Sequence, residues 1–294
     1  MVNNYERIMA RDLTKHYPEN TIRNDVYDKD GKFIYTAGQF VDENGDAYGV
    51  KEVDGKPRVS CVPYTYDIAE GLIAGHAPVR RSGKNNDVGT SFEIVAQAGG
   101  TYYWHPTAEQ MNVVSTDADD TAAGNGARTL RIQGLDTDYA LISDTVTLNG
   151  TTAVVTNLSF LRVLVVEVLT IGTSGTNEGT ITVKDSTDTY TLATIGVAEG
   201  RSSAVVFTVP ADMTFFMTSW DGSEDSSKGS EIAIYKRDFG GAWQQLRLKK
   251  IIDFAFDFPF DLPLVFAEKT DIMIQAKGLL GGAKVQAGFE GWRE

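Results

Sequence analysis

Short segments of alternating apolar and polar residues, separated by glycine and asparagine turns, constrain the fold of this chain most. From about residue 91 onward, segments such as ARTLRIQGL (127–135) and EIAIYKR (231–237) follow one another. Turn signals such as Asn149-Gly150 and Gly240-Gly241 separate them. This pattern is typical of an antiparallel sandwich or barrel. We find no period-locked repeat, which argues against a propeller or solenoid. We therefore predict an all-β protein, with a β-sandwich domain over residues 91–294.

Two segments are unusual within this domain. LSFLRVLVVEVLTIG (158–172) is nearly continuously apolar and predicts a strand covered on both faces. IIDFAFDFPFDLPL (251–264) alternates strictly, so that its apolar residues share one face. Pro259 and Pro263 cannot donate ladder hydrogen bonds, which predicts an edge strand or a strand that bends between sheets. The apolar row is interpreted as core of the sandwich, and the alternative is that part of it packs across a subunit interface. Its members are Ile252, Phe254, Phe256, Phe258, Phe260, Leu262 and Leu264.

The sequence of residues 1–60 predicts an N-terminal arm made of one short helix and small β-hairpins. A helical pattern that ends before Pro18 places four apolar residues on one face, namely Tyr5, Ile8, Met9 and Leu13. A helix this short needs a surface to pack on, so these four are candidate anchoring residues. Two-residue turns at Asp30-Gly31, Asn44-Gly45 and Asp54-Gly55 predict three hairpins. Residues 61–90, rich in glycine and proline, are expected to form a connector.

The net charge of −13 excludes several classes of partner. A strongly acidic chain has no general affinity for nucleic acid or for anionic lipid, so neither is an expected partner. A single cysteine, Cys61, excludes an internal disulfide framework. The sequence contains no apolar run of 18 residues and no secretory signal, so synthesis in a cytoplasm is expected.

No motif predicts catalysis, a cofactor or a metal site, and we expect the protein not to be an enzyme. Cys61 has no histidine nearby, and no nucleophile elbow occurs. Carboxylates cluster at 117–120 and 221–225, but 40 acidic residues make such clusters common, so solvated loops are the preferred interpretation. DKDGK (28–32) and DENGD (42–46) lack the EF-hand pattern and predict turns. The loop 221–231 could hold an ion, although a mobile surface loop is the preferred interpretation.

The segment TYYWHPT (101–107) contains the one aromatic cluster that suggests a ligand. Tyr102, Tyr103 and Trp104 are candidate glycan-stacking residues, because flat aromatic faces bind sugar rings. The alternative is a packed aromatic turn that includes His105.

Several short motifs occur in a fixed order and carry a resemblance to a known family. They are APVRRSGKNNDVG (77–89), NGARTLRIQGLDTD (125–138), DTVTLNGTTAV (144–154), SGTNEGTITV (174–183), VVFTVPADMTFFMTSW (205–220), GGAWQQLRL (240–248) and EKTDIMIQA with QAGFEGW (268–292). In these, residues 85–294 resemble virion structural proteins of tailed bacteriophages. Asp212-Met213 stands where a Gly-Lys turn is more usual in that family.

The resemblance implies a jelly-roll sandwich that assembles as a homotrimer on the virion. It implies a head spike, head fibre or capsid decoration protein, located on the capsid surface and made in the host cytoplasm. The partners implied are the major capsid protein or a neighbouring virion protein. The alternatives are a collar or tail component and a carbohydrate- or receptor-binding module that contacts a host-surface glycan. The motif residues imply turns and packing, not catalysis.

Overall fold

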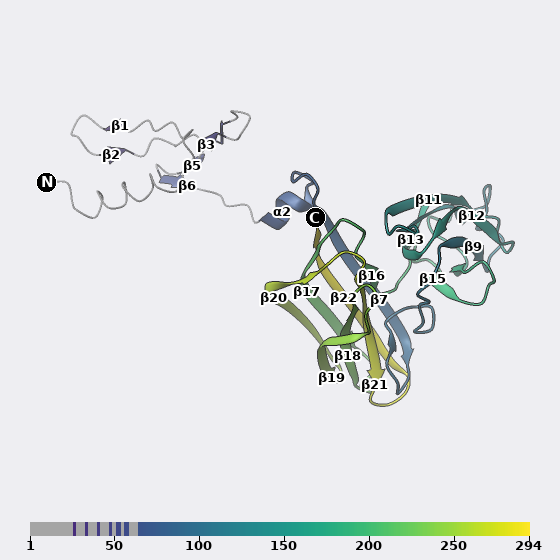
Figure 1. Cartoon of the computed structure of the whole chain (residues 1–294). Helices are drawn as coiled ribbons and strands as arrows, with labels where there is room; N and C mark the ends of the chain where they lie inside the picture. Colours follow the sequence, from purple (N-terminus) through teal and green to yellow (C-terminus); the bar gives the residue numbers. More distant parts are fainter. Residues whose placement is uncertain are drawn as a thin grey trace. The chain divides into compact units, whose positions relative to one another are not determined.

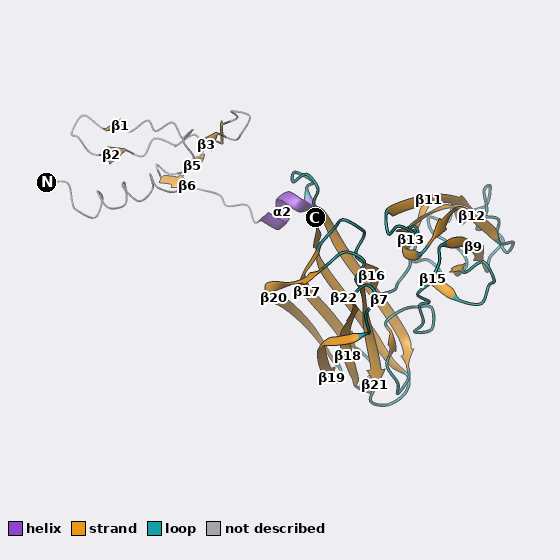
Figure 2. Ribbon diagram, in the orientation of Figure 1, coloured by secondary structure: helices purple, strands orange, loops and turns teal. Residues whose placement is uncertain are grey.

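The computed structural model describes residues 64–294, together with six short strands between residues 26 and 58. The chain forms two compact units, Met1–Tyr66 and Asp67–Glu294. Among the described residues β-strand predominates, and α2 (Tyr64–Ala69) is the one helix (Figure 2). The all-β class predicted from the alternating segments is therefore confirmed.

Three antiparallel strand pairs occur at the three turns predicted in the N-terminal arm. The pairs are β1 (Val26–Tyr27) with β2 (Phe33–Ile34), β3 (Phe40–Val41) with β4 (Ala47–Tyr48), and β5 (Lys51–Val53) with β6 (Lys56–Arg58). The helix predicted before Pro18, with Tyr5, Ile8, Met9 and Leu13, lies outside the described residues, as does Cys61.

The second unit is built on a jelly roll of eight strands, in which strands far apart in the sequence pair with one another. One sheet has the order β20-β17-β22-β7, and the other has the order β16-β21-β18-β19, with β8 paired to β21. When the two-residue strand β8 is left out and the other eight strands are numbered along the chain, the sheets run 6-3-8-1 and 2-7-4-5, which is the order of a jelly roll. The strands are β7 (Ala77–Val88), β8 (Glu93–Ile94), β16 (Val206–Thr208), β17 (Phe215–Glu224), β18 (Ser230–Arg237), β19 (Gln244–Ile251), β20 (Phe254–Phe266), β21 (Asp271–Gly278) and β22 (Ala283–Arg293).

Alternation along the strands builds the core of this jelly roll. Phe215, Met217 and Trp220 on β17 face Phe289 and Val285 on β22 in one buried cluster. Phe215 and Phe289 lie with ring centroids 5.7 Å apart. Opposite side chains on paired strands share a face, so the alternating pattern decides which residues are buried.

A second, smaller sandwich is inserted between β8 and β16 (Figure 1). Its sheets have the orders β11-β10-β13 and β12-β9-β14-β15. Its strands are β9 (Glu109–Ser115), β10 (Ala127–Leu135), β11 (Leu141–Thr147), β12 (Val154–Phe160), β13 (Arg162–Ile171), β14 (Ile181–Lys184) and β15 (Thr191–Ile195). Its core contains Ile132, Phe160, Val166 and Ile181, all fully buried.

The structure differs from the sequence-based expectation in two segments. Residues 77–88, expected in the connector, form β7, which pairs with β22 along most of its length. Residues 158–172, expected to form one strand covered on both faces, are divided at Leu161 between β12 and β13. Only the first half of β13 is buried on both faces, because its second half reaches the surface of the inserted sandwich.

Candidate functional site

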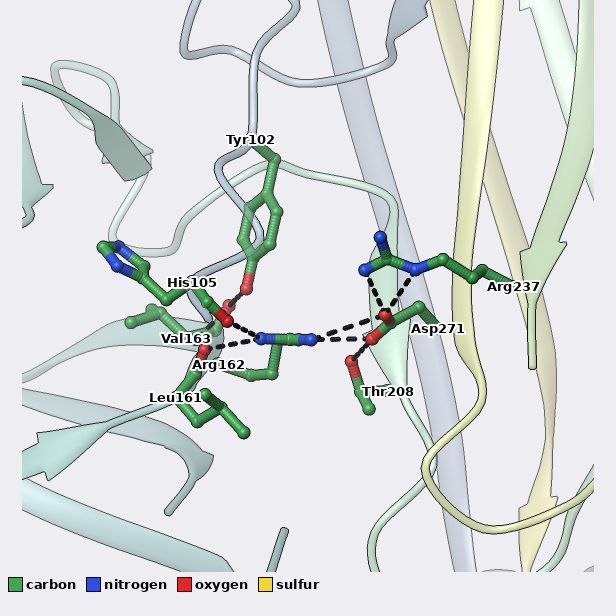
Figure 3. Close-up of polar contacts among 8 residues, drawn as sticks. All are labelled: Tyr102, His105, Leu161, Arg162, Val163, Thr208, Arg237 and Asp271. Atoms are coloured by element: carbon green, nitrogen blue, oxygen red, sulfur yellow. Dashed lines mark hydrogen bonds and ion pairs between the residues drawn. The ribbon is translucent and has the colours of Figure 1, made fainter. Parts of the chain in front are cut away.

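A buried ion-pair network joins the jelly roll to the inserted sandwich (Figure 3). Arg162 begins β13 and is 4% exposed. Its Nε donates to Asp271 Oδ1 at 3.2 Å, and its Nη1 donates to the carbonyl oxygens of His105 (2.8 Å) and Leu161 (2.9 Å). Asp271, at the start of β21, belongs to the jelly roll. The network therefore ties one sandwich to the other through a charge pair with little access to solvent.

Asp271 accepts hydrogen bonds on both carboxylate oxygens. Besides Arg162, its partners are the hydroxyl of Thr208 at 2.6 Å and the guanidinium of Arg237 at 2.5 and 3.1 Å. Hydrogen bonds between guanidinium groups and a carboxylate are among the strong ones in proteins. Asp271 therefore has a structural role, because both of its carboxylate oxygens already accept hydrogen bonds from residues of the protein.

Trp104 packs inside this junction, among guanidinium groups. The guanidinium carbons of Arg162 and Arg237 lie 5.3 and 5.5 Å from its ring centroid, within cation–π range. The ring of Trp243 lies 5.2 Å away. Trp104 is thus part of the packing that holds the two sandwiches together.

Tyr102 is buried beside Trp104 and is not available to stack on a glycan. Its hydroxyl donates to the carbonyl oxygen of Val163 (3.0 Å) and accepts from the amide nitrogen of the same residue (3.2 Å). Burial raises the pKa of the Tyr102 hydroxyl above its usual range. The proposed role of Tyr102 in a stacking platform is wrong, because both the ring and the hydroxyl are used internally.

Tyr103 points elsewhere and stacks on Tyr190, with ring centroids 3.9 Å apart and nearly parallel planes. It also contacts the edge of the buried His105 ring. Nδ1 of His105 lies 2.7 Å from the carboxylate of Glu109. Burial lowers the pKa of His105, although the charges of Glu109 and Asp185 act in the opposite direction. Tyr103 and Tyr190 are the partly exposed aromatic pair of this region.

The acidic cluster at 117–120 organises turns of the inserted sandwich. Asp120 is fully buried and accepts hydrogen bonds from the Ser115 hydroxyl (2.6 Å) and the backbone N–H groups of Ala127, Glu178 and Gly179. Backbone N–H groups in a turn often have no carbonyl acceptor, and the Asp120 carboxylate accepts their hydrogen bonds instead. Its geometry fits a structural function.

The second acidic segment, 221–231, is also ordered by internal hydrogen bonds. Glu224 is buried and accepts from the backbone N–H groups of Ser226 (2.8 Å) and Asp253 (2.9 Å), and from the Ser226 hydroxyl. Burial raises the pKa of Glu224, but these hydrogen bonds outweigh it and lower the pKa to about 2. Asp221 lies three residues earlier on the same strand, β17. Burial and the charges of Asp257 and Glu290 raise the pKa of its carboxyl group.

The Phe-rich strand β20 is an edge strand, as its prolines predict. Its apolar row is core only in part. Phe256, Phe260 and Leu264 pack against the jelly-roll core. Within residues 64–294 no strand pairs with the free side of β20. The other members of the row remain exposed; they are Ile252 (59% exposed), Phe254 (64%), Phe258 (39%) and Leu262 (83%). We call these four residues the open edge.

Opposite charges lie on the two strands that border the open edge. β19, the last strand of the facing sheet, carries Arg247, Lys249 and Lys250, and Lys249 Nζ lies 4.9 Å from the ring of Phe258. The turn before β20 and β20 itself carry Asp253, Asp257 and Asp261, all exposed. Within residues 64–294 none of these six side chains forms a salt bridge. One molecule therefore presents a basic strand beside an acidic strand, and the charged side chains named here form no salt bridges within the described residues.

The path of β20 prevents simple extension of its sheet by another strand. The register with β17 shifts between Met217 and Ser219, where β20 has the extra residues 260–263. Pro259 precedes this bulge and Pro263 lies within it. Prolines and bulges at an edge disfavour the addition of a strand. A partner at the open edge would have to pack against side chains.

Within the part of the chain that the structure describes, no three histidine, cysteine, aspartate or glutamate residues are grouped to hold a metal ion. No helix of that part is long and apolar enough to cross a membrane. The Arg162–Asp271 pair was missed from the sequence, because 109 residues separate its members. An arginine at the start of an apolar strand, VLVVEVL, is the signal that could have drawn attention to it.

Comparison with known proteins adds little to this description. No protein-family model matches the chain, and a search of curated proteins finds no match. Two matching solved structures are those of infectious bursal disease virus, Gt strain and Gx strain. Each is 12% identical; the first covers 79% of this chain and 77% of the viral chain, and the second covers 74% and 72%. TM-scores of 0.18 and 0.20 are too low for these likenesses to identify a fold family or a function.

Proposed function

We propose that the protein is a non-enzymatic structural component of a tailed-bacteriophage particle, displayed on the capsid surface as a spike, fibre or decoration protein. The open edge is the observation that carries this proposal. Exposed clusters of large apolar side chains mark surfaces that bind a partner. Two sandwiches joined by a buried ion-pair network give the stable body that such a protein needs. The order of short motifs shared with phage virion proteins supports the same function.

We further propose that the occupant of the open edge is a second copy of this chain. The basic strand β19 of one copy complements the acidic strand β20 of the next, and both lie at the same edge. Contacts of this head-to-tail kind close into rings, and a ring of three agrees with the trimer that the resemblance implies. The net charge of −13 makes a basic strand an unusual feature, which a like copy can neutralise.

Mass spectrometry of purified particles tests the virion assignment directly. We expect peptides of this protein at a fixed ratio to the major capsid protein, and antibody labelling of intact particles. Absence of the protein from purified particles, with abundant expression during infection, would contradict the proposal.

Glycan binding is a second candidate function, favoured by the stacked pair of Tyr103 and Tyr190, which is 44% exposed at Tyr190. A glycan array with the full chain tests it. We expect Tyr190→Ala to abolish any signal, whereas Tyr66→Ala, at an exposed tyrosine elsewhere, leaves it unchanged.

A further inference from the structure

Three arginines line a small cavity where the jelly roll contacts the inserted sandwich; Arg81 is half-buried, whereas Arg80 and Arg201 are exposed. Arg80 and Arg81 come from β7, and Arg201 comes from the segment between β15 and β16. With the hydroxyl-bearing Ser82 and Ser202, they form the polar lining of a cavity of about 10 Å³, whose other walls are apolar. No carboxylate lines it.

Arg81 is the least compensated of these charges. It pairs across the sheet with Phe289, so its side chain shares the core-facing side of β7. Nη1 donates to the carbonyl oxygen of Arg80 at 2.9 Å, whereas Nε is buried and has no hydrogen-bond partner among the described residues. Burial, together with the positive charges of Arg201 and Arg293, lowers the pKa of Arg81 to about 10.

The neighbouring arginines do not bring a carboxylate partner close to Arg81. Arg80 reaches the carboxylate of Glu290 at 3.5 Å, where both side chains are largely exposed. Arg201 forms no salt bridge within residues 64–294. A buried guanidinium beside like charges is costly unless a counter-charge is present.

We propose that this cavity binds a small inorganic anion of about the size of chloride, which bridges the two sandwiches. Guanidinium N–H groups and serine hydroxyls are the donors that anions prefer, and apolar walls strengthen such bonds. The cavity holds about one water-sized particle, so a phosphate or sulfate ion could place only one oxygen in it. Arg81 comes from β7, whereas Arg201 and Ser202 come from the segment before β16, so the anion links two separate parts of the fold.

Thermal unfolding of the full chain tests this site. Potassium chloride is titrated against potassium gluconate at constant ionic strength, since gluconate is too large for the cavity. We expect chloride to raise Tm of the wild type by about 2–4 °C in a saturable way. Arg201→Gln should lose this response, and in gluconate it should be at least as stable as the wild type, because it removes a like charge beside Arg81. The matched control Lys284→Gln, at an exposed lysine of β22 that does not line the cavity, should keep the full response.

Crystals soaked in bromide supply the second readout, and we expect an anomalous peak between Arg81 and Arg201. An equal chloride response in the wild type and in Arg201→Gln would show a general salt effect and would overturn the proposal. No response in the wild type, or bromide bound only elsewhere, would overturn it as well. The inference does not depend on the virion function.

Discussion

At the scale of single residues, Asp271 shows how a buried charge holds two parts of a fold together. Replacing it by asparagine keeps the shape but leaves Arg162 and Arg237 without their counter-charge. Removing one partner of a buried ion pair costs about 3–5 kcal/mol, because the other charge stays desolvated. We expect Asp271→Asn to lower the free energy of unfolding by about that amount in chemical denaturation.

The matched control is Glu290→Gln, which breaks the exposed pair with Arg80. Exposed pairs are worth less than about 1 kcal/mol, so this variant should unfold close to the wild type. Equal stability losses in the two variants would contradict the view that the Arg162–Asp271 pair fastens the junction.

The lowered pKa of Glu224 leads to a prediction about how the stability of the fold depends on pH. Its pKa in the folded protein is about 2, below its ordinary value of 4.5. A lowered pKa contributes stability that is fully present above pH 4.5 and is lost as the pH falls towards 2. We expect Glu224→Gln to lose stability at pH 7 and to show a weaker acid dependence between these two values. Denaturation curves at several pH values measure it; parallel pH profiles of variant and wild type would refute it.

At the scale of elements, the open edge beside β20 makes the strongest prediction about association. Burial of one large apolar side chain is worth about 1.5–3 kcal/mol, so its loss weakens association about tenfold or more. We expect Leu262→Asp and Phe254→Asp to convert the proposed trimer into a folded monomer, as measured by light scattering and circular dichroism. Val197→Asp, at an exposed valine of the inserted sandwich, is the control and should remain trimeric. A wild-type monomer, or trimeric edge variants, would remove the second copy from the open edge.

Charge reversal separates electrostatic from apolar contributions at the same edge. Arg247→Glu with Lys250→Glu, or Asp257→Lys with Asp261→Lys, should each weaken the trimer, because both contacting strands then carry the same charge. The four substitutions together should restore it. If the fourfold variant is weaker than either pair, the two strands do not face one another across the interface.

The elements also show what the sequence could and could not predict. Alternation predicted β17, β18, β21 and β22. Burial alternates along parts of β17 and β22, whereas β18 and β21 lie inside their sheet and are buried on both faces over part of their length. β7 was not predicted, since its residues RRSGKNND are polar and its place is decided by pairing with β22. The arginine cavity and the Arg162–Asp271 pair were missed for a related reason: both depend on contacts between distant segments, which no local pattern records.

At the scale of the whole molecule, the N-terminal arm gives the last prediction. The resemblance to phage virion proteins begins near residue 85, so the arm is the part expected to vary with the partner that it binds. We expect residues 1–60 to anchor the protein on the major capsid protein or a neighbouring virion protein, with Tyr5, Ile8, Met9 and Leu13 as the contact residues.

Deletion of residues 1–60 tests this anchor, because the deleted segment ends before α2 and contains no strand of either sandwich. The shortened protein should remain folded and trimeric, since the jelly-roll core and the open edge lie within residues 67–294. It should fail to join particles assembled without the full-length protein, as judged by sedimentation. Substituting Ile8 and Leu13 by aspartate in the full chain should have the same effect on binding without altering the fold. Normal decoration of particles by the shortened protein would instead locate the anchor in one of the sandwiches.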